Sequence, residues 1–145
     1  MLIPEKAIPA RPGKEANMNY HMSRVIESGF DEAVARVTEA LKAEGFGVLT
    51  QIDVAATLKA KLDKDFRPYR ILGACNPGLA FQALSAEDHI GVMLPCNVVV
   101  QQRDGGKVEI SAIDPSTPMS AVGNAALDNV AATVRDKLAK VVAAA

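Results

Sequence analysis

The chain has 145 residues, of which 49% are hydrophobic and 23% charged, and this composition is typical of a single globular domain. Its 16 basic and 17 acidic residues leave a net charge of −1, which provides no field to concentrate nucleic acid or an anionic membrane. The longest apolar runs are about half the roughly 20 residues of a bilayer-spanning helix.

The first 18 residues are expected to form a flexible arm. Pro4, Pro9 and Pro12 interrupt them, and they show neither a hydrophobic period nor the apolar core of a secretory signal peptide. We therefore expect a cytoplasmic protein with a single domain over residues 19–145. In that compartment the two cysteines of the chain are expected to be reduced rather than joined in a disulfide.

The first half of the domain predicts two strands and two helices. "YHMSRVIES", residues 20–28, alternates as a strand does. Ser28 and Asp31 match a capping signal for a helix that Gly45 would end. "FGVLTQI", residues 46–52, predicts the second strand, and Asp53 is placed to cap a short helix after it.

The second half predicts three strands and two helices. "YRILGAC", residues 69–75, is an interior strand, and Asn76-Pro77 opens a helix because asparagine favours the N-cap and proline the first turn. "GVMLPCNVVVQQ" and "KVEISAI" are joined by Asp104-Gly105-Gly106, a hairpin pattern. The apolar stripes expected to be buried are Leu79, Ala80, Ala83 and Leu84 in the first helix, and Leu127, Val130, Val134, Leu138 and Val141 in the last.

This order of elements predicts a two-layer α+β fold, in which helices cover one face of a mainly antiparallel or mixed sheet and the last helix is long. The other face of the sheet would still need cover. A second copy of the chain is a common source of it, so we expect a homodimer.

Cys75 and Cys96 are the residues with the most obvious chemistry. Cys75 precedes a helix N-terminus, whose free N–H groups and dipole favour a thiolate. If the two strands are neighbours, the thiols could exchange with a disulfide or accept sulfur. The alternative is that both are packed core residues, since free cysteine is often buried and then inert.

The turn Asn76-Pro77-Gly78 offers a second kind of site. Its backbone N–H groups could hold a small anion, as helix N-termini do, although capping alone also explains Asn76. A metal site would need more ligands than Cys75, Cys96 and one of the two histidines, His21 or His89, so no metal site is predicted. No cofactor is indicated.

The stretches "GFGVLTQID", "PYRILGACNPGLAFQAL", "GVMLPCNVVV" and "AIDP" resemble the prokaryotic family called domain of unknown function 302. The resemblance extends over about residues 19–138. It implies a fold of the TATA-binding-protein-like type that is commonly a homodimer. It carries no established substrate, cofactor or catalytic residue.

These observations lead to one preferred function and two alternatives. The preferred function is a homodimeric small-molecule-binding or accessory domain, with a cleft at Cys75, Asn76 and Cys96 and a small anionic ligand near Pro77 and Gly78. The first alternative is a thiol redox or sulfur-relay enzyme that uses the same cysteine pair. The second is a purely structural dimer with core cysteines.

Overall fold

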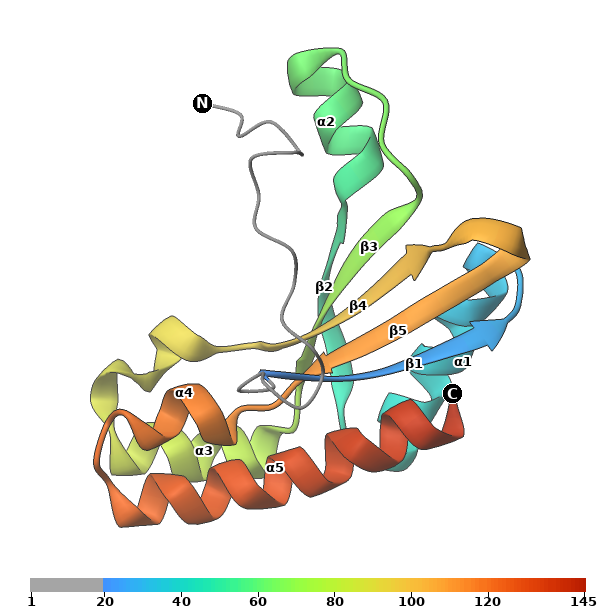
Figure 1. Cartoon of the computed structure of the whole chain (residues 1–145). Coiled ribbons are helices and arrows are strands. Elements are labelled where there is room, and N and C mark those ends of the chain that lie inside the picture. Colours follow the sequence, from blue (N-terminus) through green and yellow to red (C-terminus); the bar gives the residue numbers. More distant parts are fainter. Residues whose placement is uncertain (1–19) are drawn as a thin grey trace.

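A computed structural model describes residues 20–145 (Figure 1). The predicted arm, residues 1–18, lies outside the described residues. The elements in chain order are β1 (His21–Glu27), α1 (Phe30–Ala43), β2 (Gly47–Asp53), α2 (Val54–Leu62), β3 (Tyr69–Cys75), α3 (Pro77–Ala86), the 3₁₀ turn η3 (Asp88–Met93), β4 (Cys96–Gln102), the short turn η4 (Asp104–Gly106), β5 (Lys107–Ile113), α4 (Ser116–Ser120) and α5 (Ala125–Ala144). The predicted order of strands and helices is present, with η3, η4 and α4 in addition.

The five strands form one sheet in the order β1-β5-β4-β3-β2, and every neighbouring pair is antiparallel. The predicted α+β class is therefore confirmed, and of the two predicted kinds of sheet the antiparallel one is present. β1 and β2 are the edge strands. The pairing of β3 with β4 makes neighbours of the strands that carry the two cysteines.

Helices cover one face of this sheet, and α5 is the centre of that layer (Figure 1). It contacts α1, α3, α4 and β5. The inward side chains of the central strands meet it, and full burial of each such aliphatic side chain contributes about 1.5–3 kcal/mol. The predicted stripe of the last helix is buried as expected: Leu127, Val130, Val134, Leu138 and Val141.

Most local start and stop predictions hold, with one correction. Asp53 caps α2 by accepting a hydrogen bond from the backbone N–H of Ala56, and Gly45 follows α1 with a φ of +85°. Ser28, however, is not the cap of α1. Gly29 occupies that position, and the Ser28 hydroxyl instead donates to the carbonyl of Gly29, so the capping pattern indicated the right place and the wrong residue.

The predicted apolar stripe of α3 is only partly buried. Ala83 is buried, Leu79 and Ala80 are half-buried, and Leu84 remains 43% exposed. The expectation that all four would pack into the core is wrong, because a cavity lies beside this helix and these residues line it.

β2, α2 and β3 form an arm, residues 47–75, whose outer end projects from the rest of the molecule (Figure 1). Helix α2 stands there, away from the helical layer, and none of its nine residues is buried. Among the described helices, 20–145, none has the length and apolar character that a membrane span requires.

Candidate functional site

The fold brings Cys75 and Cys96 to the same end of the sheet. Cys75 is the last residue of β3 and Cys96 the first of β4, and the register pairs Ala74 with Cys96. Both cysteines are free thiols, Cys75 half-buried and Cys96 buried, and both line one cavity. The condition that the sequence left open, that the two strands be neighbours, is met.

The cavity beside the cysteines has a volume of about 340 Å³. It is open to solvent and is bordered by α3, by α5 and by the ends of β3 and β4. The side chains that line it are mostly apolar: Phe46, Leu49, Ala74, Leu79, Ala80, Ala83, Leu84, Leu94, Pro95, Met119, Val130 and Val134, together with Gly91, Cys75, Asn76 and Cys96. A cavity of this size and character is suited to the apolar body of a small molecule.

The chemistry of Cys96 is that of a protonated thiol. Burial, followed by the neighbouring Cys75, raises the pKa of Cys96 to about 11. A thiolate is the nucleophile in disulfide exchange and sulfur transfer. At neutral pH Cys96 therefore acts as a small apolar residue in the wall of the cavity.

The turn at the start of α3 is used mainly for capping. The Asn76 side-chain oxygen accepts a hydrogen bond from Leu79 N–H at 3.2 Å, and its amide nitrogen donates weakly to the Glu44 carbonyl at 3.5 Å. Pro77 has no N–H to offer. Of the predicted anion-binding backbone, the N–H of Gly78 thus remains without a hydrogen bond to the described residues, but Gly78 is exposed and does not line the cavity, whereas Asn76 does.

The two histidines lie apart from the cysteines. The His21 ring contacts Ser23, and His89 is exposed beside Glu87, with 3.2 Å between His89 Nδ1 and Glu87 Oε1. Within residues 20–145, no group of three or more His, Cys, Asp or Glu side chains is arranged to hold a metal ion.

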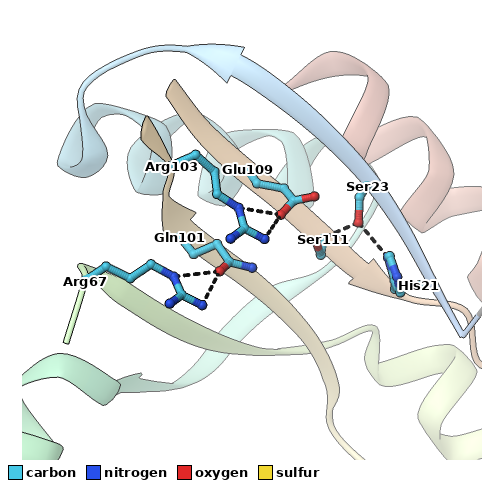
Figure 2. Close-up of polar contacts among 7 residues, drawn as sticks. All are labelled: His21, Ser23, Arg67, Gln101, Arg103, Glu109 and Ser111. Atoms are coloured by element: carbon cyan, nitrogen blue, oxygen red, sulfur yellow. Dashed lines mark hydrogen bonds and ion pairs between the residues drawn. The ribbon is translucent and has the colours of Figure 1, made fainter. Parts of the chain in front are cut away.

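The sequence interpretation missed a second concave site, on the sheet face opposite the helices. A hollow of about 400 Å³ lies over β3, β4, β5 and the start of β1. Figure 2 shows two pairs there that each contain an arginine, and a line of contacts from the Ser111 hydroxyl through that of Ser23 to the His21 ring. The residues drawn are His21, Ser23, Arg67, Gln101, Arg103, Glu109 and Ser111.

The contacts in this hollow are specific. Arg67 donates through Nε and a terminal nitrogen to Gln101 Oε1, at 3.0 and 2.9 Å, and Arg103 donates in the same way to Glu109 Oε1, at 3.0 and 2.6 Å. The sequence signal for this site is that several alternate residues of β4 and β5 are polar, among them Gln101, Glu109 and Ser111.

Fold and sites together define an α+β domain with two concave surfaces, one apolar and one polar. Residues 22–145 match the family described as Domain of unknown function DUF302. The chain belongs to this family.

A solved structure agrees with the assignment. The crystal structure of the uncharacterized conserved protein DUF302 from Bacillus stearothermophilus is similar, with a TM-score of 0.80 and 34% sequence identity, over 86% of this chain and 96% of that chain. No curated protein matches the sequence. The resemblance predicted from the cysteine-containing stretches is thus confirmed.

Proposed function

We propose that this protein is a homodimeric binding domain whose ligand is a small molecule with an apolar body, held in the cavity between α3 and α5. The observation that carries the proposal is the cavity itself, about 340 Å³ with a mostly apolar lining. Small-molecule sites are typically concave, mostly apolar surfaces of about this size. The half-exposed Leu84 on α3 would be covered by a ligand there.

The predicted small anionic ligand is compatible with this cavity if its charged end lies at the mouth. Cys75 and Asn76 line the cavity on the side where α3 begins. The positive end of the α3 dipole favours a negative group at that place. We therefore propose a ligand with an apolar chain and an anionic end.

We also propose that the chain forms a dimer, because apolar side chains are exposed on the arm formed by β2, α2 and β3. Leu49, Ile52, Leu62 and Phe66 are 40–68% exposed, and all four belong to the stretch 49–66. A nine-residue helix without a buried side chain gains little from packing within its own chain. A partner chain that covers the arm would supply the missing contacts, whereas the open sheet face carries a polar hollow.

The redox alternative uses the same two thiols, which share one cavity. The raised pKa of Cys96 weighs against Cys96 as the attacking thiol, because a protonated thiol neither attacks a disulfide nor accepts sulfur readily. The binding function needs no thiolate and is preferred for that reason. A purely structural role would leave the cavity without a ligand. The cytoplasmic location stays a prediction.

Titration with sodium octanoate, followed by backbone amide NMR, tests the binding function. We expect saturable shifts at Ala80, Leu84 and Gly91. Ala80→Leu should abolish them by filling the cavity, while Gln82→Leu, on the exposed side of the same helix, should not. 1-Octanol should bind more weakly if the anionic end contributes. Shifts that are equal in both variants would contradict the proposal.

Analytical ultracentrifugation tests the dimer. We expect a mass near twice the 15.3 kDa of one chain, and a shift toward the monomer when Leu62→Lys places a charge on the arm. A monomer at every concentration would remove the dimer and leave the cavity proposal in place.

A further inference from the structure

Gln101 is a buried polar side chain with half of its hydrogen-bonding capacity unused. It is the last residue but one of β4 and is only 8% exposed. Its oxygen accepts both bonds from Arg67, which fixes the orientation of the amide. Its nitrogen, Nε2, has no hydrogen-bond partner among residues 20–145, and it is turned away from Arg67 (Figure 2). The amide thus keeps a free donor at the hollow that Gln101 lines, and an acceptor atom of a ligand can bind it there.

The charges around the hollow point to the kind of acceptor. Arg103 is neutralised by Glu109, which it holds with two hydrogen bonds. Arg67 has no carboxylate partner in the described part of the chain, because Gln101 is neutral. Its guanidinium lies 4.4 Å from the centre of the Phe66 ring and 5.7 Å from that of Tyr69, which keeps it in place. Among the described residues that line the hollow, the positive charge of Arg67 therefore has no carboxylate to balance it.

The rest of the wall is suited to a carbon skeleton. Val99 of β4 and Ile113 of β5 line it between the polar groups, and the Tyr69 side chain lies on the same face. The Ser111 hydroxyl lies 2.7 Å from that of Ser23, which in turn lies 2.6 Å from His21 Nδ1. A volume of about 400 Å³ is within the range of small-molecule sites.

We propose that this hollow on the open sheet face is a second ligand site, specific for a small organic carboxylate. A carboxylate oxygen accepts a hydrogen bond from Gln101 Nε2, the charge of the ligand is balanced by Arg67, and its carbon body lies on Val99 and Ile113. The site is separate from the apolar cavity, since the two lie on opposite faces of the sheet and no residue lines both.

NMR with sodium benzoate as the probe tests the site on the full chain. Gln101→Glu identifies the side-chain amide signal of Gln101 by its loss. In the wild type, benzoate should shift that signal with saturation below about 10 mM, a range in which fragment-sized ligands bind. The neutral analogue benzamide should bind more weakly.

Two charge-removing variants provide the matched comparison. Arg67→Gln should weaken benzoate binding about tenfold or more, as expected for a charge-assisted contact. Lys140→Gln, which removes an equal charge from the exposed side of α5, should leave it unchanged. Equal weakening by both variants, no shift of the Gln101 signal in the wild type, or shifts confined to the apolar cavity would overturn the proposal. The wild-type titration decides the question if a variant fails to fold.

Discussion

The thiol of Cys96 should be almost unreactive in the folded protein, and Cys75→Ala isolates it as the only thiol of the chain. Burial raises the pKa of Cys96 to about 11 from an ordinary value of 9.0. Below both values, the thiolate population is therefore about a hundredfold lower than that of an exposed thiol. Cys75 is the smaller of the two causes, so its removal leaves most of the effect.

The assay is the reaction with the chromogenic disulfide DTNB at pH 8, in native buffer and in denaturant. Because Cys96 is also only 6% exposed, we expect the folded Cys75→Ala variant to react at least about a hundredfold more slowly than its denatured form. The denatured form serves as the control for thiol integrity. Reaction of the folded variant at a rate close to that of the denatured chain would refute this reasoning and revive the redox alternative.

Two further predictions concern the stability of the sheet and of its contact with α5. A side chain at Gly73 would place its Cβ 2.8 Å from the Pro95 ring and against the Thr50 side chain of β2. Gly73→Ala should therefore lower the free energy of unfolding, measured by urea titration, by about 1–3 kcal/mol. In the same titration Gly47→Ala should be nearly neutral, because no atom lies within 4 Å of a Cβ at that position. Burial tends to raise the pKa of Asp114, but hydrogen bonds from Ser116 and Arg135 outweigh this effect and lower the pKa below the ordinary 3.8. The stabilisation by Asp114 is thus complete above pH 3.8 and is lost as the pH falls through the folded-state pKa, so the difference in unfolding free energy between wild type and Asp114→Asn should shrink below pH 3.8; a constant difference would contradict the assignment.

The elements could be predicted from the sequence because their determinants are local. Asn76-Pro77 gives the start of α3, Asp53 that of α2, and the apolar period of α5 gives its buried stripe. The capping of α1 shows the limit of such patterns. Serine is a better N-cap than glycine by residue type. However, the extended residue directly before the first helical turn is Gly29, so Gly29 and not Ser28 occupies the cap position.

The sites depended on contacts between distant parts of the chain. The apolar period of α3 predicted a fully buried stripe, and nothing in that period indicates that a cavity separates part of it from α5. The approach of the two cysteines followed only from the pairing of β3 with β4. The contact between Arg67 and Gln101 joins residues 34 apart in the sequence, a loop residue before β3 and a residue of β4, and periodicity does not predict such a contact.

The most direct test of the central claim, that the cavity between α3 and α5 is a ligand site, is a structure determined after soaking with octanoate. We predict density for the ligand chain against Leu79, Ala83 and Val134, with its carboxylate near the start of α3, where Asn76 lines the cavity. An empty cavity, or one closed by inward movement of α3, in crystals soaked at a saturating concentration would contradict the claim.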